Sequence, residues 1–278
     1  MGQIVFIVWR EAAEALLVIG VLDAWLRHNA DPAERRIGRG MLWWGAAAGL
    51  AAAAALGWAL MFASGAFGED AQEIVQIVMV LTAAALIVQT VAWSRRSSGA
   101  KRALEGRMQV AVSGARWSAV FVLAAHAVAR EGAETFVFLW GSLASAQAEI
   151  APIATGIGLG IAAALATYLV IQAGSRILSW RFFFRVSEVA LLLLAGALLV
   201  TGIDRLAGLD LIPVGVPLWD TSAILDDSGP VGSLVSSLTG YRARPDAVQL
   251  SVLTAYWVAA WLFFGRPLRN VRPSVERA

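Results

Sequence analysis

The sequence predicts an all-α integral membrane protein with seven transmembrane helices. Hydrophobic residues fill 59% of its 278 positions and charged residues only 15%, which is less charge than the surface of a soluble domain usually carries. Seven apolar segments reach the length of about 20 residues that a helix needs to cross the hydrocarbon core of a bilayer. Several of the 12 Trp residues flank these segments, as residues at a membrane interface do.

In chain order, we expect spanning helices at residues 3–26, 41–63, 72–93, 117–143, 152–174, 183–203 and 248–265. The first is expected to be a retained helix and not a cleaved signal peptide, because no basic residue precedes it and because Arg10, Glu11 and Glu14 lie inside it. The chain has no Cys, which excludes disulfides, thiolate metal sites and Cys-ligated iron–sulfur clusters.

Small residues are concentrated in the second and fifth segments. The second is almost entirely Ala, Gly and Leu and contains Gly45 and Gly49, and the fifth contains Gly156 and Gly160. Glycines at this spacing let helix backbones approach closely in lipid, so we expect these four residues to serve helix packing.

The last two segments are joined by a long stretch at 204–247. Its Pro, Gly and Ser content favours a folded external loop with short helices. The acids of this loop, with Asp226 and Asp227 adjacent, either form a solvated surface or collect cations at a pore mouth.

The basic residues predict the orientation of the chain. Of the 22 Lys and Arg residues, only Arg205, Arg242 and Arg244 belong to one set of alternate loops, and Arg10 and Arg130 lie inside segments. All the others lie in the opposite set of loops or in the C-terminal tail. Cytoplasmic loops carry the excess of Lys and Arg, so we expect the N-terminus outside and the C-terminus in the cytoplasm.

Two matching charged strings, at 10–14 and 130–134, both read R-E-x-A-E and lie near the middle of the first and fourth segments. The two segments cross the membrane in opposite directions, which suggests a 3+3 inverted repeat with substrate sites near the midplane. We therefore expect one transmembrane domain over 1–278. Its parts are a first repeat at about 1–93, a second repeat at about 117–203, an external loop at about 204–247 and a seventh helix at about 248–265.

The two strings place charged side chains near the centre of the bilayer, where inserting each one costs roughly 2.5–3.5 kcal/mol. We therefore interpret the strings as a functional site. Residues three and four apart share a helix face, so Glu11 and Glu14 point the same way, as do Glu131 and Glu134. For the same reason we expect Arg10 to reach Glu14, and Arg130 to reach Glu134. Four carboxylates and two guanidiniums, from Arg10 and Arg130, would carry a charge of −2 and suit a hard multivalent cation. A purely structural ion-pair network would need balanced charge, and this cluster has twice as many acids as bases.

Four further residues are candidates for an ion path. Glu73 begins the third segment near the outer face, and Glu188 lies early in the sixth near the inner face, although each could simply extend to its interface. His126 lies one turn before Arg130 and Asp23 lies at the inner end of the first segment; either could instead be a packing or hydrogen-bonding residue.

The doubled R-E-x-x-E motif in the first and fourth of seven helices resembles the high-affinity iron permeases. These include the fungal permeases that work with a multicopper ferroxidase and the permease of the bacterial ferrous iron uptake system. The resemblance covers essentially the whole chain. Further similarities are the stretch 218–222, Gly240-Tyr241 with Pro245, and Tyr256 in the last helix. The first motif has Ala12 where the family commonly has Gly, and acidic clusters of the fungal outer loops have no match here beyond Asp226-Asp227.

The resemblance implies a multi-pass iron transporter of the plasma membrane, in bacteria the inner membrane, with Glu11, Glu14, Glu131 and Glu134 as iron ligands. It implies iron as the transported substrate, external oxidation of ferrous to ferric iron, and two periplasmic partners, a haem peroxidase and a cupredoxin-like iron-binding protein. We expect no enzyme activity, no organic cofactor and no nucleic-acid partner.

Two alternatives remain open at this point. Oxygen ligands are not selective alone, so the same fold could carry lead, manganese or another divalent cation. A membrane-embedded carboxylate metal enzyme is disfavoured because such sites commonly use Glu-x-x-His pairs, and neither His28 nor His126 follows a Glu by three residues.

Overall fold

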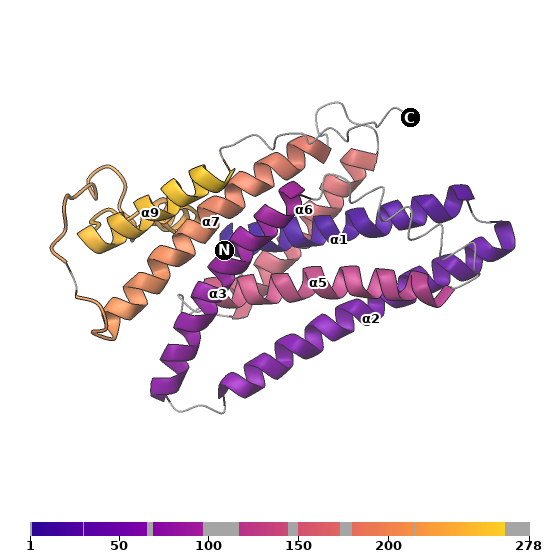
Figure 1. Ribbon diagram of the computed structural model, residues 1–278, viewed down its shortest axis with the longest axis horizontal. Coiled ribbons are helices and arrows are strands. Elements are labelled where there is room, and N and C mark those ends of the chain that lie inside the picture. Colours follow the sequence, from indigo (N-terminus) through magenta and orange to yellow (C-terminus); the bar gives the residue numbers. More distant parts are fainter. Residues whose placement is uncertain are drawn as a thin grey trace, which may run out of the picture.

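Helices dominate the part of the chain that the computed structural model describes, which is residues 2–29, 31–65, 69–96, 117–143, 150–172, 180–213 and 215–264 (Figure 1). The helices are α1 (Gly2–Asn29), α2 (Pro32–Gly65), α3 (Glu69–Arg96), α5 (Trp117–Leu143), α6 (Ile150–Gln172), α7 (Trp180–Gly208), α8 (Pro230–Thr239) and α9 (Ala247–Phe264). No strand occurs within these ranges. The expectation of an all-α protein is therefore confirmed.

Five of the helices are long and apolar enough to cross a membrane. These are the stretches Glu34–Ala63, Ala71–Arg95, Ala151–Gln172, Phe183–Gly208 and Ala247–Phe264. Helices α1 and α5 are of similar length, but the charged motifs in their middles keep them out of this set. The short α8 lies in the expected external loop. The basic stretches expected at 97–116, at 173–179 and after 264 lie outside the described residues.

The glycine pairs lie where two helix pairs make their closest approach. On α6, Gly156 lies against Ile4 and Gly160 lies against Val8, so contacts advance in the same direction along α1 and α6. These two helices therefore run parallel. Because a glycine has no Cβ, it lets a neighbouring helix approach this closely.

Helices α2 and α5 repeat this arrangement. Gly45 lies against the backbone of Phe121, and Gly49 lies against that of Ala125, so α2 and α5 also run parallel. These contacts agree with the helix-packing role expected for all four glycines. Among the described elements, α2 with α5 and α1 with α6 make the most extensive helix contacts.

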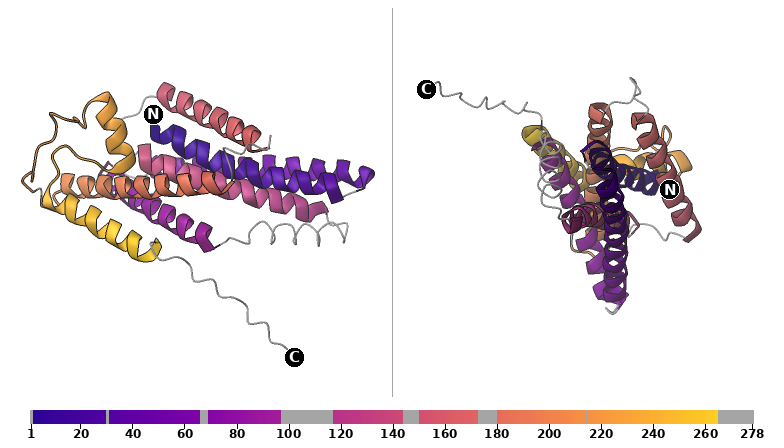
Figure 2. Two further views of the ribbon diagram at one scale, coloured as in Figure 1. Left: turned by 90° about the horizontal axis from the view of Figure 1, so that it is seen from above. Right: turned by 90° about the vertical axis from the view of Figure 1, so that its right-hand side faces the viewer.

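Helices α3 and α7 run antiparallel and share the largest hydrophobic core cluster. At one end Arg95 forms an ion pair with Glu188, and toward the other end Arg205 donates a hydrogen bond to Gln76 over 2.6 Å. Helix α9 packs beside α7 (Figure 1). In the view from above in Figure 2, α8 lies across the direction of the other helices, next to the start of α1. The amide of Gln3 donates to the carbonyl of Ser237 there.

The close approach of α1 and α6 makes a stability prediction. A Cβ added at Gly160 would lie 2.7 Å from the Cβ of Val8, closer than side-chain atoms pack, whereas one added at Gly158 on the same helix meets nothing within 4 Å. We expect Gly160→Ala to lower the free energy of unfolding by about 1–3 kcal/mol, a typical cost of overpacking. Gly158→Ala, the matched control, is expected to leave it unchanged or slightly raised.

Melting temperatures of the two variants, purified in the same detergent, give the comparison. A Gly160→Ala protein as stable as its Gly158→Ala counterpart would contradict the close packing of α1 on α6.

Candidate metal centre

The two charged motifs meet where α1 crosses α5, in the interior of the helix bundle. Glu11 is only 1% exposed and Arg10 only 2% exposed, and Glu131 is also buried. The neighbouring Ala13 is fully buried against α6 and α7, which fixes the face of α1 that turns toward α5. The charged residues are therefore held in place by close apolar packing around them.

In the first motif, one arginine serves both glutamates. Arg10 Nη1 donates to Glu11 Oε1 over 2.5 Å, and Arg10 Nη2 lies 2.6 Å from Glu14 Oε1. The pair expected between residues 10 and 14 is thus present. Charge-assisted contacts of this kind orient a carboxylate as well as offset its charge.

The second motif has the same internal ion pair but a more open setting. Arg130 Nε lies 2.8 Å from Glu134 Oε1. The Arg130 side chain is 33% exposed, compared with 3% for Arg10. Helix α3 supports both ends of this pair: the guanidinium carbon of Arg130 lies 4.3 Å from the ring centre of Trp93, and the Thr90 hydroxyl donates to Glu134 Oε2 over 3.1 Å.

Three of the four motif glutamates converge. Each of Glu11, Glu14 and Glu131 offers a carboxylate oxygen, and these three oxygens lie within 4.8 Å of one another. A cation held by three oxygens at roughly 2.0–2.6 Å keeps those oxygens roughly 3–5 Å apart, so the spacing fits one ion. Glu134 is not in this group and lies instead with Arg130 and Thr90.

Two oxygens of the group have neither a hydrogen-bond nor an ion-pair partner. Among the described residues, three buried carboxylate oxygens of the group accept no hydrogen bond: Glu11 Oε2, Glu14 Oε1 and Glu131 Oε2. Of these three, only Glu14 Oε1 has an ion-pair partner, Arg10. An unsatisfied buried carboxylate oxygen is costly, and a bound cation would satisfy it. The donor set consists only of carboxylate oxygens, which suits hard cations.

The candidate ion-path residues lie outside this carboxylate group. Asp23 pairs with Arg27 and with Arg39 at 2.6 Å each, and Glu188 pairs with Arg95. Glu73 at the start of α3 and His126 on α5 are both exposed.

Asp226 and Asp227, the two acids singled out in the expected external loop, organise the loop that contains them. Asp226 accepts hydrogen bonds from the backbone and the hydroxyl of Ser228, and these lower the pKa of Asp226 below its ordinary value. Asp227 Oδ2 accepts from the backbone N–H of Ala243 over 3.3 Å. Both acids therefore have a local structural partner.

The sequence did not point to Thr90 and Trp93 as part of the site. Thr90 is a buried polar residue inside an apolar segment, which is a weak signal because a Thr hydroxyl can also bond its own helix. Trp93 ends the third apolar segment, a position typical of a residue at the membrane interface. Only the packing of α3 against α5 brings both residues to the second motif.

Comparisons with known proteins agree on one family. The family model described as the iron permease FTR1 family matches residues 1–265. A protein named ferrous iron permease EfeU from Yersinia pestis is 27% identical over 286 residues, covering 98% of this chain and 96% of that protein. Its namesake from Escherichia coli O157:H7 is 27% identical over 280 residues, covering 95% of each. No solved structure matches the chain.

Proposed function

Because this chain belongs to the iron permease FTR1 family, we propose that it carries iron ions inward across the plasma membrane through the carboxylates of its two R-E-x-A-E motifs. Helices long and apolar enough to cross a membrane make it a multi-pass membrane protein. One observation carries the proposal. Carboxylate oxygens of Glu11, Glu14 and Glu131 lie close enough together to bind a single ion. The names of its relatives support iron as the ion.

The two arginines of the motifs stabilise the carboxylates when no cation is bound. Four carboxylates without counterions, two of them buried and two partly buried, would be costly, and Arg10 and Arg130 offset part of their charge. A cation that enters the site would bind the unpartnered oxygens of Glu11 and Glu131, while Arg10 continues to donate a hydrogen bond to the other oxygen of Glu11. Glu134, held by Arg130 and Thr90, lies one turn from Glu131 on α5 and is the fourth carboxylate of the proposed path.

We propose the topology that the basic residues favour: seven crossings, N-terminus outside and C-terminus in the cytoplasm. Successive crossings alternate in direction, so the first and fifth should run parallel, as should the second and fourth, while the third and sixth should be antiparallel. The observed directions of α1 with α6, α2 with α5 and α3 with α7 support this order.

The inverted repeat has its own support in the glycine contacts. The offset that relates Glu11 to Glu131 also relates Ile4 to Ala124 and Val8 to Val128. Gly156 of α6 contacts Ile4, and Gly45 of α2 contacts Ala124. One turn later, Gly160 of α6 contacts Val8, and Gly49 of α2 contacts Val128. We therefore propose one domain over 1–278, with repeats at about 1–93 and 117–203, the external loop at about 204–247 and the seventh helix at about 248–265.

Single cysteines at positions 73 and 188 test this topology, because the chain has no Cys of its own. We expect a membrane-impermeant thiol reagent added from outside to label Glu73→Cys and not Glu188→Cys, and permeabilised cells to label both. Exposure of Glu73 and the partial burial of Glu188 beside Arg95 set the relative rates. Equal labelling of both positions from outside would contradict the inverted arrangement.

The resemblance also supports coupling to external oxidation of ferrous iron, with a haem peroxidase and a cupredoxin-like iron-binding protein as periplasmic partners. It places the protein in the bacterial inner membrane. The permease itself would then be a conduit and not an enzyme.

Uptake into proteoliposomes tests the function directly. We expect the purified protein to admit radioactive iron, supplied either as ferrous iron with a reductant or as chelated ferric iron, and a tenfold excess of manganese or lead to compete poorly. Liposomes lacking the protein provide the background. Uptake no faster than background with both iron species would overturn the proposal, and preferential uptake of manganese or lead would reassign the substrate.

A further inference from the structure

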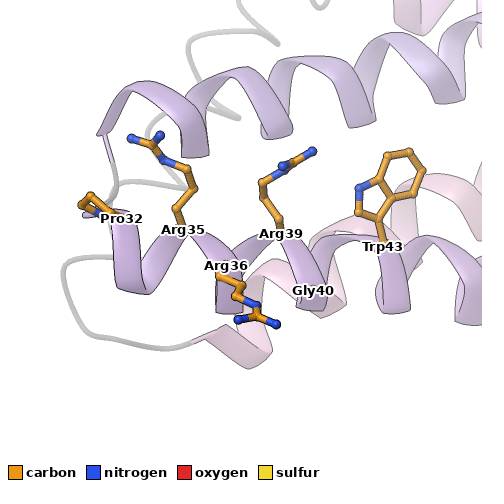
Figure 3. A pocket seen from close by; sticks show the side chains of 6 residues that line it. All are labelled: Pro32, Arg35, Arg36, Arg39, Gly40 and Trp43. Atoms are coloured by element: carbon orange, nitrogen blue, oxygen red, sulfur yellow. The ribbon is translucent and has the colours of Figure 1, made fainter.

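A cavity of about 440 Å³, open at the surface, lies beside the first three turns of α2 and outside the carboxylate centre. It is lined by Pro32, Arg35, Arg36, Arg39, Gly40 and Trp43. In Figure 3, Arg35, Arg39 and Trp43 point to one side of α2, and Arg36 points to the other side. Among the residues that the structure describes, the lining therefore contains three arginines and no acid.

Part of this positive charge is fixed in position. Arg39 Nε lies 2.6 Å from Asp23 at the end of α1, and the same carboxylate also pairs with Arg27. One carboxylate thus serves two arginines, which orients Arg39 while leaving the surroundings of the cavity positive. The exposed acids Asp31 and Glu34 are near in sequence but do not line the cavity.

The cavity lies where α2 changes from charged to apolar. The stretch of α2 that could cross a membrane, Glu34–Ala63, is mostly unburied within the protein. Large apolar side chains are exposed along it, among them Trp44, Leu50 and Trp58. Trp43, 54% exposed, marks the boundary, as aromatic residues do at the level of lipid headgroups.

We propose that this cavity binds the phosphate headgroup of an anionic phospholipid. Guanidinium groups bind phosphate through paired, charge-assisted hydrogen bonds, and Arg35, Arg36 and Arg39 can supply them from two faces. The volume suits a headgroup better than a lone ion, because sites for small molecules measure roughly 300–1,000 Å³. The acyl chains would extend along the exposed apolar face of α2.

The assignment of this lipid to the cytoplasmic leaflet rests on the proposed topology, which puts this end of α2 in the cytoplasm. The binding itself does not depend on iron transport. Basic clusters next to a membrane span on the cytoplasmic side attract anionic lipids. The phosphate chemistry would also fit free inorganic phosphate. Only a lipid would combine that contact with the apolar surface beside it.

Native mass spectrometry of the detergent-purified, delipidated protein tests the proposal without any metal. We expect phosphatidylglycerol to bind more tightly than phosphatidylcholine with the same acyl chains. Arg36→Gln should weaken phosphatidylglycerol binding about fivefold and Arg35→Gln with Arg36→Gln about 25-fold, from the usual gain per basic residue near an anionic surface. Arg244→Gln, in the external loop, is the matched control and should change nothing.

Three outcomes would overturn the proposal. The wild-type protein could bind both lipids equally, the variants could bind phosphatidylglycerol as tightly as the wild type, or millimolar inorganic phosphate could displace the lipid and reassign the site to a free anion. If the double variant does not remain monodisperse, the single change at exposed Arg36 decides the question.

Discussion

Glu11→Gln is expected to reduce iron uptake by at least about 100-fold while leaving the amount of protein in the membrane unchanged. Glutamine keeps the shape of the side chain and can still accept a hydrogen bond from Arg10, but it removes the negative charge and one carboxylate oxygen from the group of three. Losses of 10–100-fold are typical when residues that merely support metal ligands are changed, so a direct ligand should exceed that range.

The comparison needs two further variants, all assayed as initial rates of radioactive iron uptake per amount of membrane protein. Glu131→Gln should behave like Glu11→Gln, because both contribute an unpartnered oxygen to the same space. Glu34→Gln, an exposed acid outside the motifs, should transport normally. Wild-type rates in either motif variant would show that charge at the centre is not what moves the ion.

Arg10→Gln should be the most destabilising single change in the motifs. Arg10 is 2% exposed and faces both Glu11 and Glu14, so removing it leaves a buried and a partly buried carboxylate without their counterion. Breaking one partner of a buried ion pair typically costs about 3–5 kcal/mol. Arg130→Gln is the matched control, and its cost should be clearly smaller because that side chain is one-third exposed.

Melting temperatures in detergent measure this difference. Combining Arg10→Gln with Glu11→Gln should recover part of the lost stability, because the uncompensated charge is reduced, although iron uptake should stay lost. Equal losses for Arg10→Gln and Arg130→Gln would contradict the difference in burial between the two motifs.

The sequence predicted the helices well because membrane segments are set by length and hydrophobicity. The requirement for hydrophobicity also made the two motifs recognisable, because six charged residues inside apolar segments are costly and indicate a function. The spacing of Arg10 and Glu14 on one helix face was enough to predict their ion pair, which the structure contains.

What could not be predicted depended on contacts between distant segments. The separation of Glu134 from the other three glutamates follows from Thr90, which lies on another helix and takes one of the Glu134 oxygens. Likewise, Asp23 and Glu188 have arginine partners on other helices, Arg39 and Arg95. No local pattern in the sequence predicts these partners, because each pair joins two helices.

The glycine contacts have a consequence for how the molecule can move. They join α1 closely to α6 and α2 closely to α5, so each tightly packed pair takes one helix from each half of the sequence. The rigid units are then these mixed pairs and not the two sequence halves. A movement that separates Glu11 from Glu131 would occur at the interface between α1 and α5. Helix α6 would then move with the first motif on α1, and α2 would move with the second motif on α5.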